Sequence, residues 1–343
     1  MVLAPLALSA PSEPADADQA WQTILEQAAG PGTQARTREA AMQAARTHLD
    51  KQERVLRDFV RAFPDDPHRY SARIRLAAVL GSKGRLLSQP SLNTEAARLL
   101  ADLETSPATP APVRADAAFA RVSQSMEELA NRADAPGRDL LLKEVRRFDA
   151  EHPGDRRTAG LLAEVATLYD EEPTRKKSLL DEAATRTADA TLRQRIGDDQ
   201  RRLALLHRPL ALRVAALDGS PAVDVGACRG HAVVVLFWAS WSLPSLQAMA
   251  QLQRVATDFA DKPVDFLTVS LDEDRRALAG TVEATGLSWP VGCDGRGWKG
   301  ETVRALGINA LPTVWVLDRD GNLLSLNARG PQAGDLLRKA LGR

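Results

Sequence analysis

The stretch Ala232-Val-Val-Val-Leu-Phe-Trp-Ala-Ser-Trp-Ser-Leu-Pro-Ser245 decides the fold of the C-terminal part of this chain. Residues 232–237 form an unbroken apolar run, which is typical of a central strand that is buried on both faces of a sheet. The residues from Pro244 to Phe259 then have the pattern of a helix. A buried strand that leads directly into a helix predicts an α/β structure around this segment.

The segments on either side extend this pattern. Residues 211–216 and 222–225 predict two short strands around the turn Asp218-Gly219-Ser220. Strand, helix, strand, hairpin and terminal helix together predict an α/β sandwich with a mixed sheet. The later elements are expected as a buried strand at 264–270, a helix at 273–285, a shorter helix near 300–306, a hairpin of 313–318 with 323–327, and a final helix at 332–341.

The chain from about Asp18 to Leu206 has a different character. Leu, Ala, Arg and Glu dominate, apolar residues recur at spacings of three and four, and β-branched runs are absent. Proline and glycine interrupt the pattern at short intervals. We therefore predict an all-α domain of eight or nine helices, joined by short turns and packed as antiparallel hairpins.

A weak internal repeat supports helical hairpins. Each copy has the end of a helix, a turn with proline, an aspartate expected to cap the next helix, and an apolar stripe. Stacked hairpins of the tetratricopeptide type are built in this way, and a generic helical bundle with a recurrent turn is the alternative. The matched pairs are Phe59 with Phe148, Pro64 with Pro153, Asp66 with Asp155, Leu76 with Val165, and Ala77 with Ala166.

Composition excludes several classes of protein. The 343 residues are enough for two or three domains, and an apolar share of 44% with a charged share of 26% is typical of globular proteins. The 45 basic and 45 acidic residues give a net charge of +0, which disfavours nucleic acid as a partner. No run approaches the ~20 apolar residues of a transmembrane helix. With two cysteines and five scattered histidines, we expect no metal and no cofactor.

The first residues are similar to a targeting segment. Met1 to Ala10 are apolar and end in small residues, like the second half of a secretory signal peptide cleaved near Ala10. The apolar stretch is short and lacks a basic segment before it, so a floppy terminus is the alternative. We divide the chain into residues 1–17 as a signal-peptide remnant or disordered terminus, 18–206 as a helical repeat-like domain, and 207–343 as the α/β domain.

Several motifs follow one another in residues 209–343, and together they carry a family resemblance. After the strand and turn at 233–245 come Val269-Ser270-Leu271-Asp272-Glu273-Asp274, then Trp289-Pro290 through Asp294-Gly295-Arg296-Gly297-Trp298, then Gly307-Ile308-Asn309-Ala310-Leu311-Pro312-Thr313. In this order and spacing, the segment resembles the TlpA/ResA-type redoxins of the thioredoxin-like superfamily. The resemblance implies a thioredoxin-like fold, a periplasmic or envelope location in bacteria, and thiol-disulfide oxidoreductase as the family activity. The helical region has no motif of such specificity.

The turn after the buried strand departs from the family pattern. In the family it reads Trp-Cys-x-Pro-Cys, where a first thiol is activated at a helix start and a second resolves the mixed disulfide. Ser242 and Ser245 stand at the two cysteine positions. A serine hydroxyl is not ionised at neutral pH and forms no disulfide, so we expect no dithiol activity here. Leu246, Ala248 and Ala250 also differ from residues common in relatives, which favours natural loss over engineered serines.

Other nucleophiles in the chain are weaker candidates. A hydrolytic Ser242 needs a base within hydrogen-bond reach, but His231 lies at the far end of the strand, roughly 20 Å away. Cys228 lies just before this strand and Cys293 just before Asp294. We expect both cysteines to be small apolar residues, with a one-cysteine peroxidase or a disulfide between them as the alternatives.

The peptide-binding half of the family site is retained. The resemblance implies that Pro312 is the cis-proline opposite the active-site turn, with the backbone of Leu311 free to pair with an extended polypeptide. Trp241, Leu243 and Pro244 complete the expected groove. We therefore expect a redox-inactive envelope protein that binds polypeptide through this groove and the helical domain. The alternatives are family oxidoreductase or peroxidase activity, if the serines are engineered or another cysteine acts, and a redoxin domain that is only a rigid spacer.

Overall fold

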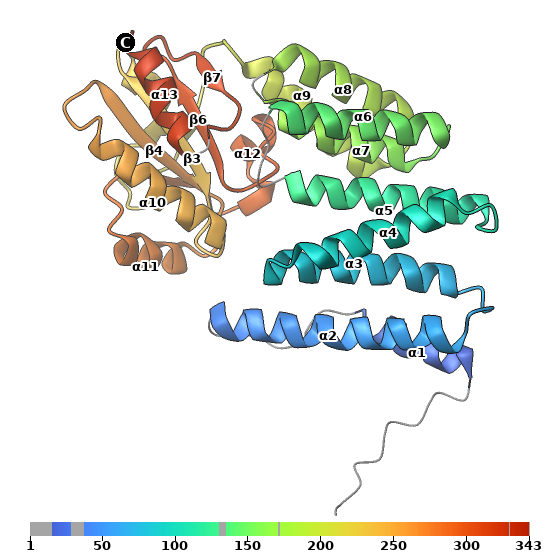
Figure 1. Cartoon of the computed structure of the whole chain (residues 1–343). Helices are drawn as coiled ribbons and strands as arrows, with labels where there is room; N and C mark the ends of the chain where they lie inside the picture. The colour runs from blue at the N-terminus through green and yellow to red at the C-terminus, as the bar shows by residue number, and fades with distance from the viewer. Residues whose placement is uncertain (1–15, 29–37, 130–134, 171, 329, 343) are drawn as a thin grey trace, which may run out of the picture. The chain divides into compact units, whose positions relative to one another are not determined.

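The computed structural model describes all residues except 1–15, 29–37, 130–134, 171, 329 and 343 (Figure 1). The expected signal-peptide remnant, residues 1–17, therefore lies almost wholly outside the described residues. By the density of contacts between residues, the chain divides into two compact units, Met1–Asp155 and Arg156–Arg343. Each unit has its own hydrophobic core.

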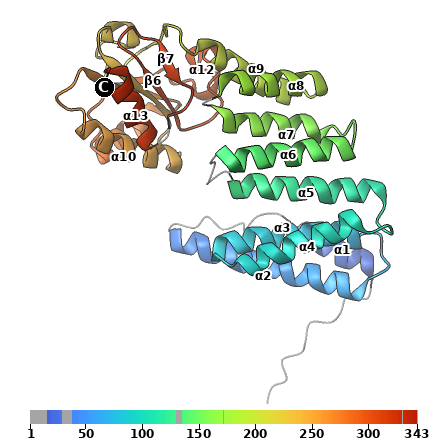
Figure 2. The same ribbon diagram turned by 45° about the horizontal axis from the view of Figure 1, so that its top comes forward.

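The described residues ahead of Leu206 form nine α-helices, which confirms the predicted all-α character and helix number. Consecutive helices within each unit pack side by side, as Figure 2 shows for α2 to α5. The first unit contains α1 (Ala17–Glu26), α2 (Arg38–Ala62), α3 (Arg69–Leu87), α4 (Pro90–Thr105), α5 (Ala111–Leu129) and α6 (Ala135–Glu151). The second unit begins with α7 (Arg157–Ala166), α8 (Pro173–Arg186) and α9 (Ala190–Leu205).

The internal repeat marks positions that are buried in both copies. Phe59 near the end of α2 and Phe148 near the end of α6 are buried, and so are the matched pairs Leu76 with Val165 and Ala77 with Ala166. The predicted aspartate cap, however, is wrong. The residue before α3 is His68 and the residue before α7 is Arg156, and neither side chain caps its helix. Asp66 instead accepts the backbone N–H of His68 at 2.7 Å and so stabilises the turn.

The second unit contains a five-stranded mixed sheet in the order β5-β4-β3-β6-β7, which confirms the predicted α/β sandwich. Strand β3 is parallel to β4 and antiparallel to β6, and β4 is parallel to β5. A separate two-stranded ribbon precedes the sheet. The strands are β1 (Arg213–Val214), β2 (Val223–Asp224), β3 (Ala232–Trp238), β4 (Val264–Ser270), β5 (Val291–Cys293), β6 (Thr313–Leu317) and β7 (Leu323–Ser325).

Alternate side chains of β3 enter two separate cores because successive residues of a strand point to opposite faces. Val234, Leu236 and Trp238 pack with α10 (Leu243–Thr257), α11 (Arg275–Thr285) and α13 (Pro331–Ala340). Val233, Val235 and Phe237 pack with β1, β2, α12 (Glu301–Ala305) and the end of α9. Figure 1 shows α10 and α13 together over one face of the sheet. The continuous apolar run is thus buried on both faces, as predicted.

The elements differ from the prediction mainly at short strands. The strands expected at 211–216 and 222–225 are each only two residues long in β1 and β2. Strand β5 is an element that the sequence pattern did not indicate, since it has three residues with Gly292 at its centre. A Cβ at Gly292 would lie 3.0 Å from Cβ of Val214, so glycine allows β1 to pass close to β5.

Candidate functional site

Ser242 is the N-cap residue of α10 and Ser245 lies in the first turn of this helix. The Ser242 Oγ accepts the backbone N–H of Ser245 at 3.4 Å, and the Ser245 hydroxyl donates to the same oxygen at 2.9 Å. Both side chains are buried. Serine is a preferred N-cap residue because its oxygen satisfies a backbone N–H that the helix leaves unpaired. The two hydroxyls are therefore paired with each other and with the helix start.

The residues beside Ser242 are exposed and apolar. Trp241 is 63% exposed and Leu243 is 65% exposed, whereas large apolar side chains are usually buried. Pro244, in the first turn of α10, is exposed as well. The start of the helix therefore presents an apolar surface beside two hydroxyls that are hydrogen-bonded to each other.

The peptide bond between Leu311 and Pro312 is cis. Both residues are half-buried, and the next residue, Thr313, pairs with Phe237 near the end of β3 that leads into the serine turn. The turn and the proline therefore lie at the same end of the sheet. Leu311 also packs against the core cluster of the face that carries α12.

Asp272 holds the residues that lead into the serine turn, a role that the sequence did not indicate. Its carboxylate accepts the backbone N–H of Ser240 at 2.9 Å and the hydroxyls of Ser240 at 2.5 Å and Ser270 at 2.6 Å. Asp272 is buried, so these donors replace water around its charge. The capping role belongs to Asp274, which accepts two backbone N–H groups at the start of α11. The position of Asp272 just after a buried strand marks it as a candidate site residue, but the sequence does not show which residues it contacts.

The two cysteines are free, so no disulfide joins them. Burial raises the pKa of the Cys293 thiol, which lies in the core with its Sγ 3.4 Å from the carbonyl oxygen of Asp272. Burial and the nearby carboxylate of Asp265 raise the pKa of Cys228 to about 11. Both thiols are therefore less ionised at neutral pH than a free cysteine.

His231 belongs to a different end of the sheet from the serines. Its Nδ1 lies 3.0 Å from Oδ2 of Asp265, and the residue immediately precedes the first residue of β3. The serine turn follows the last residue of the same strand, so the structure does not bring His231 to Ser242. Among the described residues, no three His, Cys, Asp or Glu side chains are grouped as a metal site.

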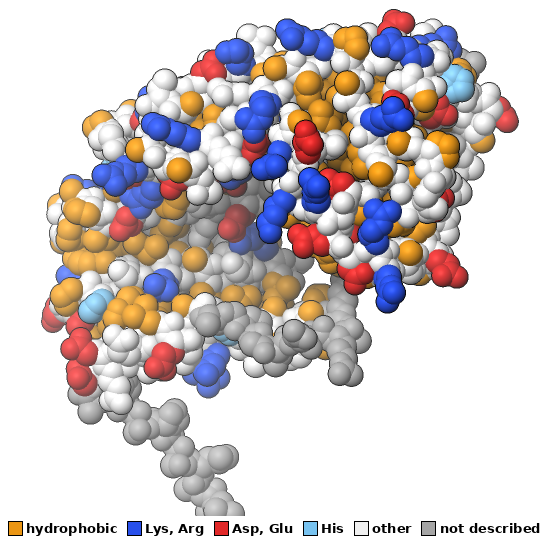
Figure 3. Space-filling model, turned by 180° about the vertical axis from the view of Figure 1, so that it is seen from behind, with side chains coloured by type: hydrophobic (Ala, Val, Ile, Leu, Met, Phe, Trp, Pro, Cys, Tyr) orange, Lys and Arg blue, Asp and Glu red, His pale blue; other side chains and the backbone are white. Residues whose placement is uncertain are grey.

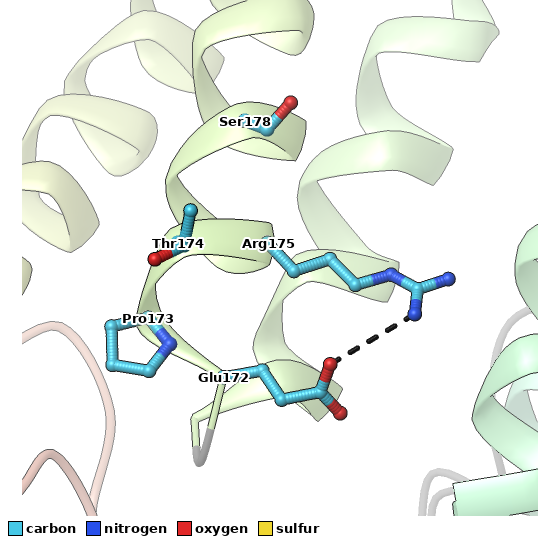
Figure 4. Close-up of a pocket in the computed structure, with 5 residues that line it drawn as sticks. All are labelled: Glu172, Pro173, Thr174, Arg175 and Ser178. Carbon is cyan, nitrogen blue, oxygen red and sulfur yellow. Dashed lines mark ion pairs between the residues drawn. The ribbon is translucent and has the colours of Figure 1, made fainter.

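A further hollow of about 550 Å³ lies at the start of α8. Figure 4 shows Pro173, Thr174 and Ser178 along the helix, with an ion pair between Arg175 and Glu172 at 3.8 Å. None of these residues belongs to the predicted groove. On the face seen in Figure 3, basic and acidic side chains are intermixed rather than gathered by sign.

Comparison with known proteins identifies the domain that carries the serine turn: residues 210–335 match the Redoxin family. This part of the chain is a redoxin domain with a thioredoxin-like fold, and its relatives include thiol-disulfide oxidoreductases. A thiol-disulfide oxidoreductase ResA of Bacillus thuringiensis is 27% identical over 128 residues, which are 37% of this chain and 71% of that protein. The thioredoxin-like protein YneN of Bacillus subtilis is 29% identical over 98 residues, which are 27% of this chain and 54% of that protein.

Solved structures of similar proteins include a thiol-disulfide oxidoreductase from Bacteroides fragilis. It is 28% identical, with a TM-score of 0.36, and the match covers 38% of this chain and 96% of that chain. Within the described ranges of the present chain, no helix combines the length and apolarity needed to cross a bilayer.

Proposed function

We propose that this protein is a redoxin-domain protein of the bacterial cell envelope that has lost dithiol chemistry and binds polypeptide. The binding groove consists of Trp241, Leu243 and Pro244 at the start of α10, with Leu311 and Pro312 beside them. The helical region supplies a second surface for the same partner.

Export is supported by the apolar start of the sequence. A fusion to alkaline phosphatase, which is active only outside the cytoplasm, tests it.

One observation carries this proposal: two hydroxyls that are hydrogen-bonded to each other stand at the positions of the thiols, next to two exposed apolar side chains. The hydroxyls of Ser242 and Ser245 are hydrogen-bonded to each other at 2.9 Å. Neither side chain has the sulfur atom that disulfide exchange requires. Trp241 and Leu243 remain 63% and 65% exposed. Covering them with a partner's apolar residues yields about 25 cal/mol per Å² of buried apolar area.

Reduction of insulin by dithiothreitol tests the loss of dithiol chemistry. We expect the parent chain to leave the rate unchanged and the double variant Ser242→Cys/Ser245→Cys to accelerate it, because the fold then holds both thiols at a helix start. Acceleration by the parent would overturn the proposal. It would point instead to the oxidoreductase or peroxidase alternative through Cys228 or Cys293, whose raised pKa values oppose that role.

Binding is tested with fluorescein-labelled, carboxymethylated insulin B chain, an unfolded polypeptide without free thiols. The variants Trp241→Ala and Leu243→Ala are each expected to weaken binding by about tenfold, since each removes ~1–2 kcal/mol of apolar contact. Leu140→Ala tests the second surface in the same way, because this leucine of α6 in the helical region is also exposed, at 57%. Weakening by Leu140→Ala alone would assign binding to the helical region instead of the groove.

A further inference from the structure

The loop ahead of Pro312 lies directly against the backbone of α9, within the second unit. Figures 1 and 2 both show α9 beside α12, the helix that leads into this loop. A Cβ added at Gly307 would lie 2.4 Å from the carbonyl oxygen of Asp198 and 3.2 Å from Cγ of Arg202. Gly307 also has a φ of +68°, which favours glycine. At this position the loop and the helix touch with no side chain between them.

Two residues after Gly307, the side chain of Asn309 makes a second contact between the loop and α9. The Asn309 Nδ2 donates to Oδ1 of Asp199 at 3.4 Å. Asp199 is 2% exposed and forms an ion pair with Arg202, which is 9% exposed. Since a buried charge is costly without its partner, Arg202 fixes the position of the carboxylate that Asn309 uses. Asn309 therefore donates to a carboxylate that is buried and held by an ion pair.

The C-terminal end of α9 is itself attached to the sheet. The segment that follows the helix pairs with the backbone of β7. The N–H of His207 donates to the carbonyl oxygen of Leu323 at 2.8 Å, and the N–H of Leu323 donates to the carbonyl oxygen of Arg208 at 3.0 Å. Leu203 and Leu206 pack against the same core cluster as Leu311. The helix is thus held at the sheet edge while its middle contacts the loop.

We propose that α9 positions the segment Gly307–Leu311 and thereby sets the groove that Leu311 and Pro312 offer to an extended polypeptide. The identity of the ligand rests on the proposed function, whereas the hold of α9 on the loop rests on the contacts alone. Asp199 and Asn309 act here as positioning residues. The groove is then a joint property of a helix ahead of the redoxin domain and of the redoxin domain itself.

Hydrogen–deuterium exchange on the full chain tests the hold of α9 on the loop. Gly307→Ala places a methyl group against the Asp198 carbonyl, so exchange across residues 307–311 and 190–205 should rise together, by about tenfold or more. Gly286→Ala is the matched control: its φ is +61°, but a Cβ there meets nothing within 4 Å. The control carries the same backbone strain at the end of α11 without touching α9.

Asn309→Ala is a milder variant for the case that Gly307→Ala does not fold. It removes one hydrogen bond from a half-buried side chain and should raise exchange of the loop only. Affinity for the carboxymethylated insulin B chain is measured on the same samples. Gly307→Ala and Asn309→Ala should weaken this binding several-fold, and Gly286→Ala should leave it unchanged.

The exchange and binding results together show whether the hold of α9 on the loop or the binding of polypeptide fails. Faster loop exchange with weaker binding supports both. Loop exchange in Gly307→Ala and Asn309→Ala equal to that in Gly286→Ala overturns the inference, as does faster exchange with unchanged binding. If the parent itself does not bind the B chain, the proposed function fails, and faster exchange still supports the hold of α9 on the loop.

Discussion

Thiol chemistry requires a sulfur atom and an environment that stabilises its anion. The start of α10 has the environment without the sulfur, and the two cysteine sites of the same domain have the sulfur without the environment. At Ser242 the environment suits a thiolate, because a helix begins there and a backbone N–H is directed at the side-chain atom, but that atom is oxygen. At Cys228 and Cys293 the atom is sulfur, but burial raises the pKa of both thiols. The difference shows that reactivity needs the right atom and the right environment at one residue, and in the described structure no cysteine has both.

The largest effect is expected from placing sulfur in the favourable environment. In the single variant Ser242→Cys, the new thiol should have a pKa of about 7.5 or lower, because the helix start stabilises its anion. A free thiol has a pKa of about 8.5. The pH dependence of iodoacetamide labelling measures this value.

Ser245→Cys is the internal control for that measurement. Ser245 is fully buried, so the sulfur placed there should react slowly at every pH. A pKa of about 8.5 or higher for the thiol in Ser242→Cys would remove the contrast between the two regions. The start of α10 would then be no better an environment for a thiolate than the sites of the native cysteines.

The second expected effect concerns the native thiol of Cys228. With its pKa at about 11, roughly 0.1% of this thiol is ionised at pH 8, against roughly a quarter of a free thiol. Labelling should therefore be about two hundred-fold slower than for free cysteine and should rise about tenfold per pH unit up to pH ~10. Cys228→Ala gives the background from Cys293. Fast labelling of Cys228 at pH 8 would contradict the assignment of both thiols as inert.

The same shift has a consequence for stability with a definite sign. The pKa of Cys228 is raised to about 11 in the folded state, so the folded chain holds this proton more tightly than the unfolded chain. Its stabilising contribution is complete below pH 9 and is lost as the pH rises towards 11. The difference between the parent and Cys228→Ala in urea unfolding should narrow over that range.

The third expected effect falls on Asp272, which connects the two regions. Its carboxylate holds Ser240 next to the serine turn, and its carbonyl oxygen lies near Sγ of Cys293. Asp272→Ala leaves buried donors unpaired and should lower the free energy of unfolding by about 2–3 kcal/mol. Asp274→Ala, a nearby helix cap that is exposed, should cost about 1 kcal/mol. If urea unfolding showed the same loss of stability for both variants, Asp272 would contribute no more than the exposed helix cap Asp274.

The parts of the site that depend on neighbouring residues could be predicted from the sequence. The apolar run of β3, the helix start at Ser242 and the position of Pro312 in its motif all follow from local patterns. The family resemblance adds the consequence of serine in place of cysteine. Local patterns suffice because capping, strand burial and turn formation are decided within a few residues.

The parts that depend on distant residues could not be predicted. Ser240 meets Asp272 across 32 positions and Asn309 meets Asp199 across 110 positions, so no spacing in the chain signals either contact. The sequence changes character at His207, whereas contacts divide the chain after Asp155. A change of composition marks where helices give way to strands, but which helices pack together is settled by side-chain fit.

The smallest expected effect is the difference in stability between serine and alanine at Cys293, where serine makes the reverse exchange of sulfur for oxygen. Its side chain is fully buried among apolar residues, so Cys293→Ala should lower the free energy of unfolding by about 1 kcal/mol through lost packing. Cys293→Ser should cost about 1 kcal/mol more, because burial of a hydroxyl is unfavourable. Urea unfolding of the two variants measures the difference. Equal stability would mean that the carbonyl of Asp272 accepts the new hydroxyl and that this site tolerates oxygen as well as the start of α10 does. The contrast between the two regions would then rest on ionisation alone and no longer on polarity.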